Sequence, residues 1–110
     1  MKTRYAFADP KAPPRIGVAA SNPPMTGGVV FDTFELDGTD QEALRVVEER
    51  NTPLRVERFE QGSWQPYAEE YAATDSGYDE ARMFIQAIEG IGGGPVRLVS
   101  ERGVPIPHKP

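Results

Sequence analysis

The stretch PLRVERFEQGSWQPYAEEY, residues 53–71, is the most informative segment of the sequence, because it has the composition of two β-strands joined at a glycine. A two-residue turn at 61–62 would pair Phe59 with Trp64 and would place a glutamine where positive φ is required. A three-residue loop at 60–62 leaves only Gly62 in the left-handed region and pairs Phe59 with Ser63. This second register separates apolar from charged residues, so the sequence predicts a bulged hairpin.

The bulged register assigns each side chain of the hairpin to a face. One face would hold Leu54, Val56, Trp64, Pro66 and Ala68, and the other Arg55, Glu57, Gln65, Tyr67 and Glu69. Trp64 is then expected beneath the helices. An outward row of aromatic and guanidinium groups is predicted on the opposite face, made of Arg55, Phe59, Tyr67 and Tyr71.

The elements on either side of the hairpin are predicted from local patterns. Residues 29–38 are rich in β-branched and aromatic residues and end in an Asp-Gly turn, which indicates a strand. A short amphipathic helix follows, with Thr39 and Glu42 as a capping box, and it ends at Asn51 and Pro53. A second helix begins near Asp75 or Ser76 and ends at Glu89.

The glycine run GIGGGP, residues 90–95, follows the second helix and does not precede one. A phosphate-binding loop has to lead into a helix N-terminus, where the amide groups point at the anion. The run is therefore interpreted as a helix stop, with Gly90 or Gly92 in the left-handed region, before a strand at residues 96–99.

The ends of the chain are rich in proline, which opposes helix and central strand. Residues 1–28 are expected to form an extended arm, in which only residues 16–18 could pair with a sheet, or in which Tyr5 and Phe7 cover a sheet face. Residues 29–106 would form one α+β domain and residues 107–110 a tail. The order strand, helix, strand, strand, helix, strand predicts a ferredoxin-like antiparallel sheet with both helices on one face.

Composition excludes several classes of function. The chain has 110 residues, no cysteine and a net charge of −5, so disulfides, thiolate chemistry and zinc–cysteine sites are ruled out and nucleic acid is disfavoured. The first residues lack the apolar core of a signal peptide, which favours a cytoplasmic protein without membrane association. The single histidine, His108, is expected to be a solvated tail residue, and no serine lies in a nucleophile motif.

These observations favour a non-catalytic protein-interaction module, a small accessory protein of bacterial or phage origin that needs no cofactor or metal. It would bind a protein partner or a second copy of itself through the outward row or the proline-rich ends. A ligand-binding or enzymatic domain, with a pocket lined by Trp64, Tyr67 and arginines, is the alternative. Base stacking on Phe59 and Tyr67 beside Arg55 is a third hypothesis, which the acidic charge opposes.

Overall fold

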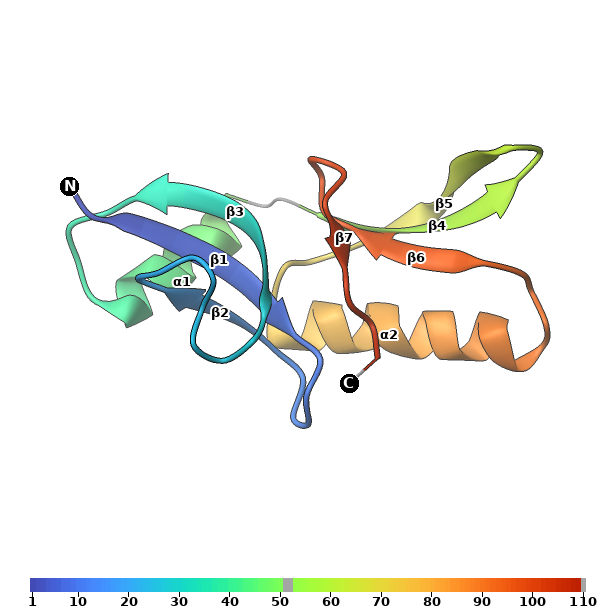
Figure 1. Cartoon of the computed structure of the whole chain (residues 1–110), viewed down its shortest axis with the longest axis horizontal. Helices are drawn as coiled ribbons and strands as arrows, with labels where there is room; N and C mark the ends of the chain where they lie inside the picture. Colours follow the sequence, from blue (N-terminus) through green and yellow to red (C-terminus); the bar gives the residue numbers. More distant parts are fainter. Residues whose placement is uncertain (51–52, 110) are drawn as a thin grey trace.

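The chain folds into two antiparallel sheets in place of the single sheet expected from the sequence (Figure 1). The computed structural model describes residues 1–50 and 53–109. The elements are β1 (Thr3–Asp9), β2 (Arg15–Ala19), β3 (Val29–Glu35), α1 (Asp40–Glu49), β4 (Leu54–Glu60), β5 (Ser63–Tyr71), α2 (Asp75–Gly90), β6 (Val96–Val99) and β7 (Pro105–Ile106). The sheet orders are β2-β1-β3 and β5-β4-β6-β7, so the α+β class is confirmed and the ferredoxin-like order is wrong.

The first sheet is built mostly from residues that were expected to form an arm. β1 is its central strand, and the anticipated pairing segment at 16–18 lies in β2, opposite Ala6 to Ala8. The Phe7 ring occupies the space beside Gly17 and Gly28, where added Cβ atoms would lie 2.6 and 2.4 Å from it. These two glycines are therefore packing residues, although glycine in a proline-rich stretch usually indicates a flexible loop.

The second sheet is covered on one face by α2. The side chains of Leu54, Val56 and Leu98 on that face are fully buried in a cluster that includes Ile85 of α2. Figure 1 shows α2 (orange) running beneath β4 and β6, and the β4–β5 hairpin at the end of the molecule away from the N-terminus. β5 is an edge strand, which tolerates Pro66 because an edge does not need every backbone N–H.

The hairpin has the two-residue turn that the sequence argument rejected. Glu60 pairs with Ser63 and Phe59 with Trp64, and both Gln61 (φ 53°) and Gly62 (φ 81°) are left-handed. Two left-handed residues match the right-handed twist of the strands, which outweighs the poor fit of glutamine to positive φ. The tip of the hairpin is exposed on both faces, so the rule of one apolar face does not apply there.

The irregular pairing lies further along β5. Between the pairs Glu57–Pro66 and Arg55–Glu70, β4 has one residue and β5 has three, residues 67–69. The two additional residues of β5 leave the alternation of faces unchanged beyond the irregularity.

We expect Gly62→Val to lower the free energy of unfolding by about 1–3 kcal/mol, because a β-branched residue is strained at φ 81°. An added Cβ meets no atom within 4 Å, so the loss is conformational and not steric. Urea unfolding measures it. Gln61→Asn is the matched control and should be neutral or slightly stabilising, because asparagine tolerates the left-handed region. An unchanged midpoint for Gly62→Val would contradict the two-residue turn.

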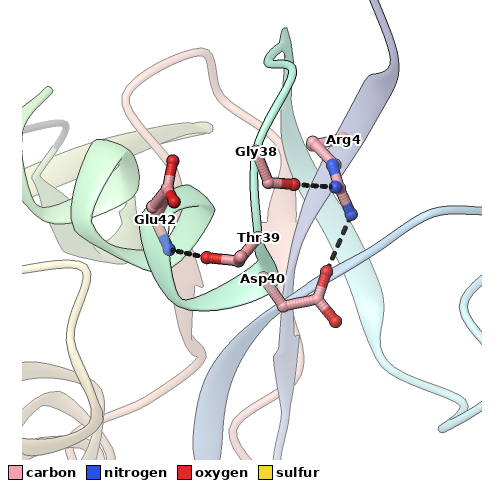
Figure 2. A network of polar contacts seen from close by, with 5 residues as sticks. All are labelled: Arg4, Gly38, Thr39, Asp40 and Glu42. Atoms are coloured by element: carbon pink, nitrogen blue, oxygen red, sulfur yellow. Dashed lines mark hydrogen bonds and ion pairs between the residues drawn. The ribbon is translucent and has the colours of Figure 1, made fainter.

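The start of α1 is fixed by a polar network that joins it to β1 (Figure 2). Thr39 is the N-cap, as predicted, and its hydroxyl accepts a hydrogen bond from the Glu42 N–H at 3.1 Å. The buried Arg4 side chain donates to Asp40 Oδ1 at 2.7 Å and to the Gly38 carbonyl. The cap thus orders the first turn locally, and Arg4 attaches that turn to the central strand. Asn51, expected to end this helix, lies outside the described residues.

Helix α2 begins at a polar N-cap and ends at the glycine run, as the sequence predicts, although the capping residue differs. Thr74 is the N-cap and accepts from the Gly77 N–H at 3.1 Å, one residue earlier than the caps considered. At the other end Gly92 has φ 72°, and the amides of Gly92 and Gly93 donate to the carbonyls of Glu89 and Ile88. These two bonds form a Schellman motif, so the glycine run is a helix stop.

The two sheets share one hydrophobic core, in a molecule of 45 × 25 × 21 Å. Residues of the first sheet and α1 lie in the same buried cluster as residues of the second sheet and α2. A buried carboxylate adds a polar link, since Asp32 of β3 lies 3.3 Å from Arg50 Nε and 3.7 Å from Arg102 Nη2 in the β6–β7 turn. The two halves therefore stabilise each other.

The C-terminal segment lies against α2, which corrects the expectation that His108 is solvated. Tyr78 Oη donates to the Pro107 carbonyl, and Arg82 Nε donates to the His108 carbonyl at 3.2 Å. The His108 side chain is 19% exposed, and burial lowers its pKa despite the nearby Glu89 carboxylate. Burial also raises the pKa of Tyr78 to about 12. The hydrogen bonds from Tyr78 and Arg82 thus attach the C-terminal segment to α2.

Candidate interaction surface

The sheet face turned away from α2 carries a cluster of aromatic and charged side chains. Pairing in the ladder places residues on the same side, so the register defines this outer face. It comprises Arg55, Glu57 and Phe59 of β4, Trp64, Pro66 and Glu70 of β5, and Arg97 of β6. Val99 shares this side but is buried, whereas Arg55 and Glu70, level with it on β4 and β5, remain partly exposed.

The centre of the outer face is a stack of three side chains. Phe59 and Trp64 are opposite each other in the ladder, with ring centroids 5.4 Å apart and planes at 67°. The Arg97 guanidinium lies 4.3 Å from the centroid of the Trp64 ring. Phe59 remains 47% exposed, whereas Trp64 is half-buried between its two neighbours. Edge-to-face and cation–π geometry thus hold Trp64 in position and leave Phe59 accessible.

The arginines of the outer face are matched by carboxylates. Arg97 Nη2 lies 2.7 Å from Glu57 Oε1, and Arg55 Nε lies 3.0 Å from Glu70 Oε2. Two arginines and two glutamates leave the outer face without net charge. A neutral face does not provide the phosphate neutralisation that nucleic-acid binding requires.

The structure separates the four residues of the expected row. Arg55 and Phe59 lie on the outer face, as predicted. Tyr67 and Tyr71 instead face α2, where their ring centroids lie 5.1 and 6.3 Å from that of Phe84. Tyr71 is buried, and burial together with a hydrogen bond to Glu69 raises its pKa.

Trp64 was predicted beneath the helices and instead lies on the outer face, the reverse of the change seen for Tyr67 and Tyr71. Its predicted position followed from the three-residue loop, and the two-residue turn reverses the face of every β5 residue near the hairpin. On the α2 side of the sheet the Arg58 guanidinium lies 4.9 Å from the centroid of the Tyr67 ring, and this ring packs against Phe84. Trp64 and Tyr67 therefore do not line one pocket between the sheet and the helices, as the alternative hypothesis required, because they lie on opposite faces of the sheet.

Arg97, like Trp64, is a residue of this surface that was not predicted from the sequence. Its signal was present in the alternation of VRLV, where Arg97 and Leu98 must face opposite sides. The pairing of Arg97 with Glu57 and its stacking on Trp64 depend on strand order. Strand order is a long-range property that the spacing within one strand does not encode.

One hollow lies away from the outer face, and a second reaches Arg97 of that face. A groove of about 360 Å³ is lined by Ile16, Leu44, Val47, Glu48, Ala73, Thr74, Asp75 and Ser76. A second, more open hollow of about 340 Å³ lies along β6, β7 and the C-terminal segment. In residues 1–50 and 53–109, His, Asp and Glu side chains do not gather in threes as a metal ion would need.

No helix in the described part of the chain combines the length and apolar character needed to cross a bilayer. Comparisons of the chain with protein-family models, with curated proteins and with solved structures found no match.

Proposed function

We propose that the protein is a non-catalytic interaction module that binds a protein partner through the outer face. The observation that carries this proposal is Phe59, a large apolar side chain that is 47% exposed on a sheet face without a covering helix. Trp64 contacts it and Arg97 stacks on Trp64, and tryptophan and arginine are among the residue types most enriched at binding hot spots.

The arrangement around Phe59 favours recognition because its neighbours are already ordered. Trp64 contacts Phe59 on one side and Arg97 on another, and Arg97 is held by Glu57. Side chains that are fixed before binding lose little conformational entropy on binding, which costs about 0.5–1.5 kcal/mol for each flexible side chain. The charges around the rings form a polar rim with balanced sign, as protein interfaces commonly have.

We expect Phe59→Ala to leave the melting temperature nearly unchanged and to weaken partner binding or self-association by about 1–3 kcal/mol. The stability cost is small because Phe59 is half-exposed at the hairpin tip. Sedimentation velocity at two concentrations reports self-association. Capture from the native host, compared between wild type and variant, reports a heterologous partner.

Met83→Ala is the matched control for Phe59→Ala. Met83 is 61% exposed on α2, whose buried residues face the sheet, so it is an apolar side chain outside the outer face. A partner retained by wild type and by Met83→Ala but lost from Phe59→Ala supports the proposal. If Phe59→Ala retains every partner and sediments as wild type does, the outer face is not the interaction surface.

A further inference from the structure

The groove beside α1 joins three elements and is separate from the outer face. β2 provides Ile16, α1 provides Leu44, Val47 and Glu48, and residues 73–76 at the start of α2 complete it. Ile16, Val47 and Ala73 are buried and form apolar walls. Its volume of about 360 Å³ lies at the lower end of the range of about 300–1,000 Å³ that is typical of small-molecule sites.

The charged side chains that line the groove are all acidic. Its titratable groups are Glu48 and Asp75, and no lysine, arginine or histidine is among the residues that line it. Asp75 Oδ1 accepts a hydrogen bond from the Ile16 N–H at 2.8 Å and lies at the positive end of α2, so its charge is partly compensated. Glu48 is exposed, and its side chain takes part in no ion pair or hydrogen bond among residues 1–50 and 53–109.

The position of Glu48 strengthens its attraction for a cation. It lies in the last turn of α1, where the helix dipole is negative and where no basic residue is present. Arg50, the C-cap, is directed away to Asp32 and to the Phe34 ring. A cation at Glu48 would therefore interact with a carboxylate and with the negative end of a helix together.

From this geometry we propose that the groove binds a small organic ammonium ion with an apolar chain. The ammonium group lies at Glu48, and the chain lies along Ile16, Val47 and Ala73. The proposal is independent of the outer face, because none of the residues that line the groove belongs to that face. The groove's size favours a free amine over an extended peptide, which would need a longer channel.

The test is a titration of the full chain with hexylammonium, followed through backbone amide and methyl NMR shifts. Shifts are expected at Leu44, Val47, Ala73 and Ser76, and the amides of the β4–β5 hairpin should stay unchanged. Glu48→Gln should weaken binding about two- to fivefold, in line with an exposed ion pair. Asp75→Asn should weaken it less, because asparagine still accepts the Ile16 N–H.

Glu49→Gln is the matched control, since it removes the same charge from the next residue of α1 and does not line the groove. Hexanol and hexanoate test the charge of the ligand, and both should bind more weakly than hexylammonium. Equal binding of hexanol, equal weakening by Glu49→Gln, or an absence of shifts in the groove would each overturn the proposal. Tighter binding of a Gly-Lys-Gly peptide would overturn the choice of a free amine.

Discussion

Gly77→Ala is expected to lower the free energy of unfolding by about 3 kcal/mol or more, although alanine is the better helix former. Gly77 lies in the first turn of α2, and its N–H donates to the Thr74 hydroxyl. An added Cβ would lie within van der Waals overlap of the Ala72 backbone, 2.8 Å from its carbonyl carbon and amide nitrogen and still closer to its oxygen. Backbone cannot rotate aside as a flexible side chain can, so the steric cost exceeds the helix-propensity gain of about 1 kcal/mol.

Gly90→Ala is the matched control, and it is not expected to destabilise the protein. Gly90 is the last residue of α2, its backbone is not left-handed, and an added Cβ meets nothing within 4 Å. It should be neutral or stabilise by up to about 1 kcal/mol. Chemical denaturation of both variants measures the difference. Stabilisation by Gly77→Ala would show that the turn before α2 is not as close as the structure has it.

Leu98→Ala is expected to destabilise the protein by about 2–5 kcal/mol, because it removes a fully buried side chain from the inner face of the second sheet. Leu98 pairs with Val56 in one neighbouring strand and Ile106 in the other, so the cavity would open at the centre of the sheet. Each kcal/mol corresponds to about 4–8 °C in melting temperature for a domain near this size. Thermal unfolding followed by circular dichroism measures the change.

Trp64→Ala tests the assignment of faces when it is compared with Leu98→Ala. Trp64 is larger, yet it is half-buried on the outer face and loses mainly its contacts with Phe59 and Arg97. A loss below about 2 kcal/mol is expected, since an aromatic pair contributes about 0.5–1.5 kcal/mol beyond its buried area. A larger loss for Trp64→Ala than for Leu98→Ala would place Trp64 beneath the helix and reverse both faces.

Local signals in the sequence predicted the parts of the fold that depend on a few neighbouring residues. The Thr39 cap and the left-handed Gly92 are determined within one helical turn, and both are confirmed. The first sheet was missed because its glycines act at a distance. Gly17 and Gly28 accommodate the Phe7 ring, and nothing near them in sequence distinguishes this role from flexibility.

Only part of the candidate surface was predicted, because part of it depends on the pairing between strands and not on local sequence. Arg55 and Phe59 follow from alternation within β4, which holds in either register. The faces of Trp64 and Tyr67 depend on whether Gln61 adopts positive φ. The free energy that disfavours this conformation for glutamine is small compared with the free energy of forming the whole hairpin. A single residue in the turn therefore decides which aromatic side chains reach the surface.

The shared core also has a consequence for synthesis of the chain. β1, β2, β3 and α1 are complete by residue 49, but the apolar side of this half packs on strands and a helix that end at residue 106. At about 5–20 residues per second, residues 50–106 take roughly 3–11 s to be translated. For that interval the apolar residues of β2 and β3 that pack on α2 and β7 in the folded protein stay uncovered, and such exposed surface is prone to aggregate.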